Sequence, residues 1–206
     1  MSEGVQGSLL VVCAANVCRS PFAAFLLGRE LPDIEVSSVG VTARAGDPLC
    51  RFTEERIDAL AGDADLAEAH VATRLDAESI DRADLILTAS EAERSAVAML
   101  APEARPKTFT LVEAAYGARA LSPLAADTTL RELAVQMHAQ RGLVDLPEKR
   151  RRHRLSPFRA SYGIAIPDAH IGDTRKHDEV YRTVTDAVTM FAGAWDGARQ
   201  PVEASD

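Results

Sequence analysis

Cys13 and Arg19 stand six positions apart near the start of the chain, in the segment Cys-Ala-Ala-Asn-Val-Cys-Arg-Ser-Pro. A thiolate is a strong nucleophile, and a guanidinium can hold two oxygens of a phosphate group with parallel hydrogen bonds. Arginine also stabilises the charge on the equatorial oxygens during phosphoryl transfer. A lone cysteine at the end of a strand is usually a small buried residue. The pairing with arginine favours a functional interpretation here.

The elements around this pair predict an anion-binding loop. Residues 8–13 form a short apolar run typical of a buried parallel strand, and Ser20-Pro21 reads as the N-cap and first residue of a helix. Backbone N–H groups in such a turn, together with the helix N-terminus, converge on an anion and favour the thiolate form of cysteine. Asn16 tolerates left-handed backbone angles, and the Ser20 hydroxyl is placed to donate to the thiolate or to a leaving phosphate. The predicted phosphate-binding residues are Ala14, Ala15, Asn16, Val17, Cys18, Arg19 and Ser20.

Strands and helices alternate through the rest of the chain. Further strands are predicted at 34–39, 83–88 and 107–111, and helices at about 53–62, 90–100 and 180–195, the second opened by a capping box of Ser90 and Glu93. This order predicts a single α/β domain over residues 1–206, built on a parallel sheet.

Residues 116–160 fit the alternation poorly and are predicted to be a surface insertion. The segment contains an expected helix at 128–141 and a basic run at 149–154. Such a run is either a solvated face or a patch that attracts anionic substrates.

Composition limits the remaining possibilities. The 206 residues are 47% hydrophobic and 26% charged, with a net charge of −8, which is typical of a globular protein and unfavourable for duplex nucleic acid as a partner. Because the apolar runs are too short for a bilayer and no signal peptide is recognised, we expect a cytoplasmic protein without a membrane partner. The three cysteines predict neither a disulfide framework nor a metal site, and no cofactor is expected. No feature indicates an oligomeric state.

The loop and its surroundings resemble the low-molecular-weight protein tyrosine phosphatases. The signature of that family is a cysteine, five residues and Arg-Ser near the N-terminus, usually with an asparagine and a second cysteine inside, and this chain matches all of those positions. The resemblance extends over most of the chain outside residues 116–160. It implies a three-layer α/β/α fold with a four-stranded parallel sheet and flavodoxin-like topology. It also implies hydrolysis of a phosphorylated protein or a small phosphomonoester through a cysteinyl-phosphate.

The same resemblance assigns three residues outside the loop. Asp168, in Ile-Pro-Asp-Ala-His, stands where the family has its general acid, which must protonate the departing oxygen. Asp173 and Asp178 are nearby alternatives without the preceding Ile-Pro. Ser38 lies in a segment similar to the family's Ser-Ser/Ala-Gly, and His70 resembles a family residue that supports the loop asparagine by hydrogen bonding.

Departures from the family pattern concern the substrate more than the phosphate. Ala169 replaces the usual proline, His170 stands where an aromatic residue often lines the substrate mouth, and residues 42–49 contain no aromatic residue. We therefore predict a weaker preference for aryl phosphates than is typical of the family. Cys18 is either a small loop residue or a partner for a reversible disulfide with Cys13.

Two rival functions share parts of this pattern. A thiol-dependent arsenate reductase uses the same anion loop but needs resolving thiols, and residues 78–100 contain no cysteine. A non-catalytic phosphate-binding protein would have no need of the Cys13 thiol.

Overall fold

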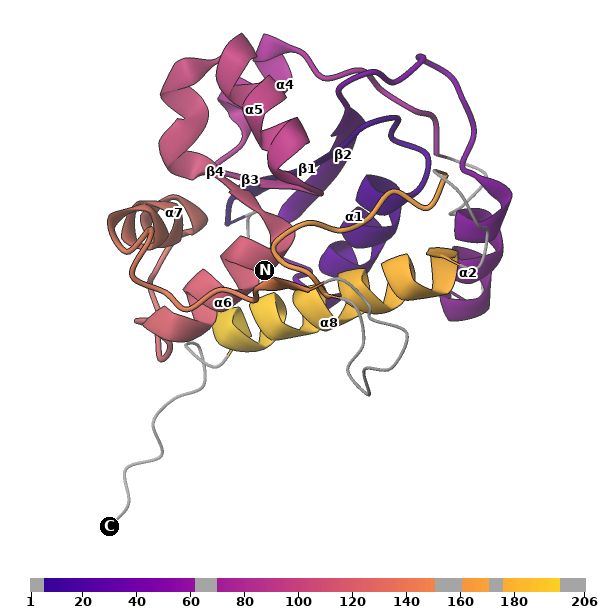
Figure 1. Ribbon diagram of the computed structural model, residues 1–206. Coiled ribbons are helices and arrows are strands. Elements are labelled where there is room, and N and C mark those ends of the chain that lie inside the picture. Colours follow the sequence, from indigo (N-terminus) through magenta and orange to yellow (C-terminus); the bar gives the residue numbers. More distant parts are fainter. Residues whose placement is uncertain (1–5, 62–69, 151–160, 171–175, 197–206) are drawn as a thin grey trace, which may run out of the picture.

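A four-stranded sheet organises the computed structural model, which describes residues 6–61, 70–150, 161–170 and 176–196 (Figure 1). The strands lie in the order β2-β1-β3-β4 and every neighbouring pair is parallel. Their bounds are Ser8–Cys13 (β1), Glu35–Gly40 (β2), Leu85–Thr88 (β3) and Thr108–Thr110 (β4). The predicted parallel sheet is confirmed, each strand within two residues of its expected bounds.

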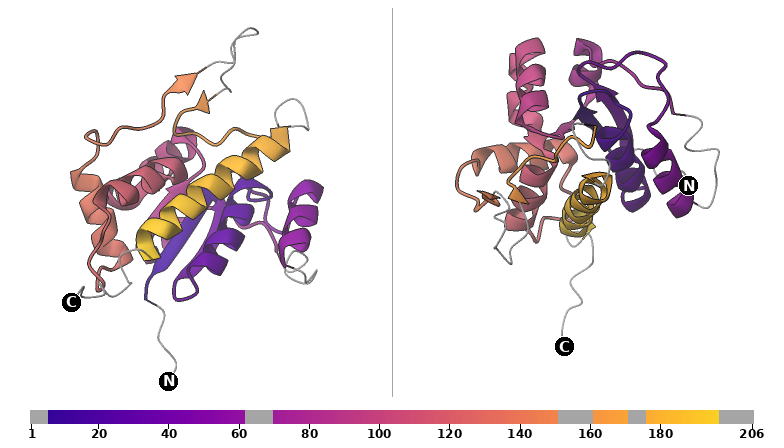
Figure 2. Two further views of the ribbon diagram at one scale, coloured as in Figure 1. Left: turned by 90° about the horizontal axis from the view of Figure 1, so that it is seen from below. Right: turned by 45° about the vertical axis from the view of Figure 1, so that its right-hand side comes forward.

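Helices cover both faces of the sheet, which gives the three-layer α/β/α fold (Figure 1). One face carries α1 (Arg19–Glu30), α6 (Leu111–Leu121) and α8 (Lys176–Asp196), with α8 running alongside the other two (Figure 2). The other face carries α4 (Ala77–Arg82), α5 (Glu91–Leu100) and the 3₁₀ helix η1 (Pro102–Lys107). Helix α2 (Arg51–Ala61) lies beside α1.

The side chains of β1 explain why both faces are covered. Successive residues of a strand point to opposite faces, and Leu9 and Val11 belong to the core beneath α1, α6 and α8, whereas Leu10 and Val12 belong to the core beneath α4, α5 and η1. All four are at most 2% exposed. An uninterrupted apolar run is therefore what this central strand requires.

Part of the segment expected to be a surface insertion lies in the core instead. Helix α7 (Leu130–Ala139) buries one face, formed by Leu130, Leu133, Ala134 and Met137, and α6 continues to Leu121. The surface interpretation is wrong for α7, because its amphipathic face packs on the main core and its N-terminus is fixed by a capping box of Thr129 and Glu132. Farther on, β5 (Lys149–Arg150) pairs with β6 (Ser161–Tyr162). Residues 151–160, including most of the basic run, lie outside the described residues.

Two predicted capping patterns differ from the structure. Helix α1 begins at Arg19 with Cys18 as N-cap, so Ser20 is already inside the helix and its hydroxyl makes other contacts. Ser90 does cap α5 by accepting from the Ala92 N–H, but the Glu93 carboxylate contacts the Ser90 hydroxyl and Arg19 rather than closing the predicted box. In both cases a contact with the functional loop replaces the local capping pattern.

In the parts of the chain that the structure describes, every helix is too short or too polar to cross a bilayer.

Candidate active site

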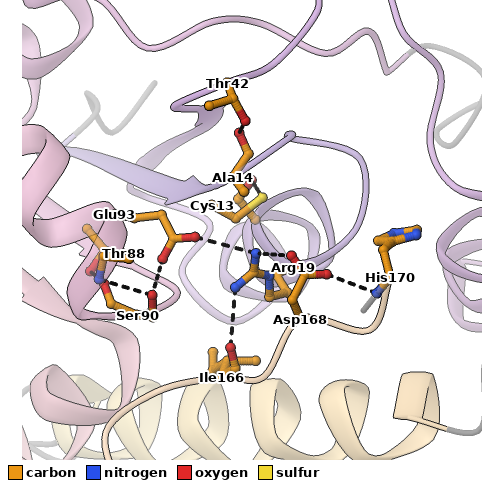
Figure 3. A network of polar contacts seen from close by, with 12 residues as sticks. Cys13, Ala14, Arg19, Thr42, Thr88, Ser90, Glu93, Ile166, Asp168 and His170 are labelled. Atoms are coloured by element: carbon orange, nitrogen blue, oxygen red, sulfur yellow. Dashed lines mark hydrogen bonds and ion pairs between the residues drawn. The ribbon is translucent and has the colours of Figure 1, made fainter. Parts of the chain in front are cut away.

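The loop from Ala14 to Cys18 lies at the carboxyl end of β1, between that strand and α1 (Figure 3). Here β1 has β2 on one side and β3 on the other, so the chain crosses from one half of the sheet to the other. In open α/β sheets, ligands bind in the crevice that forms outside the strand ends at such a switch point.

Most carbonyl groups in and beside the loop are bonded to other parts of the chain. The Cys13 carbonyl accepts from the Val41 N–H, that of Ala14 from the Thr42 N–H, that of Val17 from the Cys50 N–H and that of Cys18 from the Phe22 N–H, at 2.8–3.2 Å. The Asn16 carbonyl lies 2.9 Å from His70 Nε2. Because a trans peptide holds its C=O and N–H in opposite directions, the following N–H groups point away from these partners. N–H groups exposed in this way form a nest, a backbone concavity of the kind that can bind an anion.

Asn16 fixes the curvature of the loop. Its φ of 56° makes it the one non-glycine residue with a positive φ among those described, a conformation that asparagine tolerates better than most residues. The side chain is fully buried; its Nδ2 donates to Ser20 Oγ (3.0 Å) and Ser38 Oγ (2.9 Å), and its Oδ1 accepts from the Thr73 N–H (2.9 Å). The structure thus brings both predicted residues to Asn16. Ser38 contacts its side chain, and His70 contacts its backbone carbonyl.

Gly40 gives the loop the space it needs. It ends β2 opposite Cys13, and a Cβ atom there would lie 2.7 Å from both the Ala14 carbonyl oxygen and the Asn16 nitrogen. Contacts this short with backbone atoms are not relieved by a rotamer change. The loop can therefore approach β2 only because the residue has no side chain.

The Cys13 sulfur accepts two hydrogen bonds from groups in and beside the loop. Sγ accepts from the Asn16 N–H at 3.3 Å and from the Ser20 hydroxyl at 3.0 Å, and the residue is 2% exposed. Donors of this kind stabilise a negative sulfur. The Ser20 hydroxyl also lies 3.3 Å from the Val39 carbonyl oxygen, a competing acceptor for its single proton.

Arg19 crosses the mouth of the loop between two carboxylates (Figure 3). Its Nη2 lies 3.0 Å from Asp168 Oδ2 and 3.4 Å from Glu93 Oε1, and its Nη1 donates to the Ile166 carbonyl at 3.3 Å. The guanidinium is buried, so its orientation is set by these three partners. Of the three, only Asp168 belongs to the residues expected from the sequence.

Asp168 is held at both carboxylate oxygens. Oδ1 accepts from the His170 N–H at 2.9 Å while Oδ2 pairs with Arg19, and the segment is tied to the sheet by the Ile166 N–H, which donates to the Ala89 carbonyl at 2.8 Å. Ala169 is 2% exposed. The missing proline thus leaves Asp168 with defined partners, since the segment is fixed by burial and by hydrogen bonds on either side.

Cys18 faces Cys50 rather than the interior of the nest. Its buried sulfur lies 3.9 Å from the Tyr181 hydroxyl and within 4.8 Å of Cys50 Sγ. The hydrogen bond between the two thiols and the burial of Cys18 raise its pKa, and the same hydrogen bond lowers the pKa of Cys50. The less buried sulfur, that of Cys50, is therefore the more acidic of the two. All three cysteines are free.

Glu93 is the functional candidate that sequence reasoning missed. The sequence pattern predicts that it forms half of a capping box, but it is 5% exposed and contacts Arg19. A glutamate three residues after an N-cap serine is so common a local pattern that it hides any tertiary role. Thr73, which contacts Asn16 through its backbone N–H, has no sequence signal because any residue except proline supplies that group.

Comparisons with known proteins agree with this geometry. The model of the family described as low molecular weight phosphotyrosine protein phosphatase matches residues 8–122, which include the whole loop. The chain belongs to this family. Its members hydrolyse phosphomonoesters through a cysteinyl-phosphate, so the chain is a phosphatase.

Individual relatives cover about half of this phosphatase. The low molecular weight protein-tyrosine-phosphatase Ptp of Acinetobacter johnsonii is 36% identical over 107 residues, 50% of this chain and 71% of the relative. The protein-arginine-phosphatase of Geobacillus stearothermophilus is 36% identical over 110 residues, 53% of this chain and 72% of the relative. Among solved structures, the YwlE arginine phosphatase of G. stearothermophilus aligns with a TM-score of 0.63 at 21% identity, covering 97% of this chain and 99% of that one. That likeness shows the fold.

Proposed function

We propose that this phosphatase acts on phosphorylated proteins, with Cys13 as nucleophile, Arg19 as phosphate clamp and Asp168 as general acid. The observation that carries the proposal is the position of Arg19, which joins the nest around the Cys13 sulfur to the Asp168 carboxylate at 3.0 Å. Phosphotyrosine is the substrate class favoured by the family, and the tyrosine phosphatase relatives support it.

In the first step the Cys13 thiolate attacks phosphorus. The phosphate group takes the place of Asp168 as partner of Arg19, so that the carboxyl group is released toward the leaving oxygen. The S–P bond forms as the P–O bond of the ester breaks, and Asp168 in its protonated form gives its proton to the departing oxygen. Arg19 and the N–H groups of the nest hold the equatorial oxygens.

In the second step a water molecule replaces the cysteine. Asp168, now a carboxylate, takes a proton from the water, whose oxygen attacks phosphorus as the S–P bond breaks. Inorganic phosphate leaves and the thiolate is restored. The Ser20 hydroxyl, 3.0 Å from Cys13 Sγ, donates to the returning negative charge and lowers the barrier to its departure.

Substitution of Cys13 tests the chemistry. The full-length Cys13→Ser protein should lose hydrolysis of p-nitrophenyl phosphate yet still gain thermal stability from inorganic phosphate, because the nest and Arg19 remain. Phosphorylated proteins should then be retained by the variant and released by free phosphate. Undiminished turnover by Cys13→Ser would exclude the proposed nucleophile.

The substrate class is tested with peptides of one sequence that carry phosphotyrosine, phosphoserine or phosphoarginine. The third is included because of the similarity to a protein-arginine-phosphatase. We expect phosphotyrosine to be hydrolysed best, but by no more than about tenfold in kcat/KM over phosphoserine, a difference of about 1.4 kcal/mol. The preference should be weak because residues 42–49 contain no aromatic side chain. A much larger preference for tyrosine would contradict this weak selectivity, and faster hydrolysis of phosphoarginine would replace the proposed substrate.

The rival functions have less support. Cys18, the thiol nearest to Cys13 in sequence, is buried against Tyr181 and Cys50, so it is poorly placed to resolve an adduct on Cys13 as an arsenate reductase requires. A protein that only bound phosphate would not need a sulfur with two hydrogen-bond donors. Turnover of arsenate with a thiol reductant, without hydrolysis of p-nitrophenyl phosphate, would reverse this preference.

A further inference from the structure

Four metal-ligating side chains meet beside the phosphate loop, outside the proposed reaction. Cys18, Cys50, His170 and His177 each offer one ligand atom, and these atoms all lie within 4.8 Å of one another. They come from four separate places: the end of the loop, the residue before α2, the segment that holds Asp168, and the first turn of α8. Such spacing along the chain resembles no zinc motif, which explains why the sequence did not indicate a site.

The donor set matches one kind of ion. Two thiolates and two imidazoles are the ligands of structural tetrahedral zinc sites, with Zn–S distances of about 2.3 Å and Zn–N distances of about 2.0–2.1 Å. Tetrahedral geometry with these bonds separates the donors by up to about 4 Å, so only a small closure of the cluster is needed. We propose that Cys18, Cys50, His170 and His177 form a zinc site.

Surrounding groups are arranged to hold three of the ligands. The Thr53 hydroxyl lies 3.1 Å from Cys50 Sγ and 3.0 Å from the Tyr181 hydroxyl, which in turn lies 3.9 Å from Cys18 Sγ. The His177 ring packs on the Phe52 ring at 4.4 Å between centroids. Outer-shell hydrogen bonds and packing of this kind orient the ligands of metal sites.

The cluster also has a route for the ion. Cys18 and His177 are buried, Cys50 is half-buried and His170 is exposed. An ion can therefore enter from the His170 side and lose its water as it reaches the thiols. Bound there, it would join the end of the phosphate loop to the residue whose N–H holds Asp168. This role is additional to the proposed reaction and does not depend on it.

Metal binding by the full-length Cys13→Ser protein tests the proposal. The substitution removes the one cysteine outside the cluster, and binding is read without reference to activity. We expect one zinc per chain by elemental analysis of reduced protein. Cobalt(II), used as a probe, should give the absorption of a tetrahedral thiolate site. Zinc at about 100 times its Kd should raise the melting temperature by roughly 5–10 °C.

Substitutions within and outside the cluster give the control. Cys50→Ser and His170→Asn change the two less buried ligands. Each should weaken cobalt binding by more than about 100-fold, a larger loss of affinity than removal of an outer-shell partner causes. His138→Asn, in α7 and outside the cluster, should leave binding unchanged. Absence of zinc and of the cobalt spectrum in protein with reduced thiols would overturn the proposal. So would unchanged binding in both ligand variants.

Discussion

Glu93→Gln removes one of the two negative charges that flank Arg19 while preserving the size of the side chain. At 3.4 Å, the attraction between the two charges is up to ~5 kcal/mol at an effective dielectric constant of about 20. Much of this is offset by the cost of burying both groups. Arg19 also keeps Asp168 at 3.0 Å, and the amide oxygen of glutamine still accepts a hydrogen bond. The expected net loss is that of one charged hydrogen bond, about 1.5–3 kcal/mol in the free energy of unfolding.

The catalytic effect should appear in kcat rather than in KM. Because Glu93 orients Arg19 and Arg19 is needed most when charge develops on the equatorial oxygens, we expect kcat to fall about tenfold, or 1.4 kcal/mol, with little change in KM. Steady-state hydrolysis of p-nitrophenyl phosphate and urea unfolding measure the two effects.

The matched control for this variant is Glu91→Gln. Glu91 is exposed in the same first turn of α5, so its substitution also removes a negative charge from the helix N-terminus. If Glu93→Gln and Glu91→Gln had the same stability and the same kcat, Glu93 would not be a positioning residue for Arg19.

Three further predictions test other parts of the site. Gly40→Ala should abolish stabilisation by inorganic phosphate, because its Cβ would meet loop backbone atoms at 2.7 Å. The control Gly28→Ala, with open space around its Cβ, should retain this stabilisation. Thermal shift assays measure the effect of phosphate on both variants. Asp168→Asn should lower kcat by about 10²–10⁴ for an alkyl phosphate and by less for p-nitrophenyl phosphate, whose leaving group needs no proton; equal losses would argue against a general acid. Cys50 alkylation by iodoacetamide, followed by mass spectrometry in chelator-treated Cys13→Ser protein, should change little between about pH 6 and pH 8, because a lowered pKa leaves the thiolate already formed. A tenfold rise per pH unit would indicate an ordinary thiol.

The sequence alone indicated the loop and the strand before it because both are local. A run of apolar residues, a turn containing asparagine and a helix start are set by consecutive residues, and the anion nest follows from their backbone angles. The same logic failed at Ser20. Its N-cap signal was outweighed by the Cys13 sulfur and the Val39 carbonyl, which only the folded chain brings within reach.

Asp168 shows the limit of reasoning from residues without a fold. An aspartate in a turn has no local feature that distinguishes a catalytic acid, and only the family resemblance selected it. The fold brings it to Arg19 because the Ile166 N–H joins its segment to the end of β3 through Ala89. The surface interpretation of the α7 segment was wrong for a similar reason. A helical segment reveals its apolar face but not which surface covers that face.

The consecutive residues of the loop thus predict the chemistry of the nest: a cysteine, an arginine and a backbone shaped to hold an anion. What surrounds the nest depends on the fold. Glu93 behind Arg19, Gly40 against the loop, and Cys50 beside Cys18 all come from elements distant along the chain. Their positions depend on the order of strands in the sheet and on helix packing, which no local pattern of residues encodes.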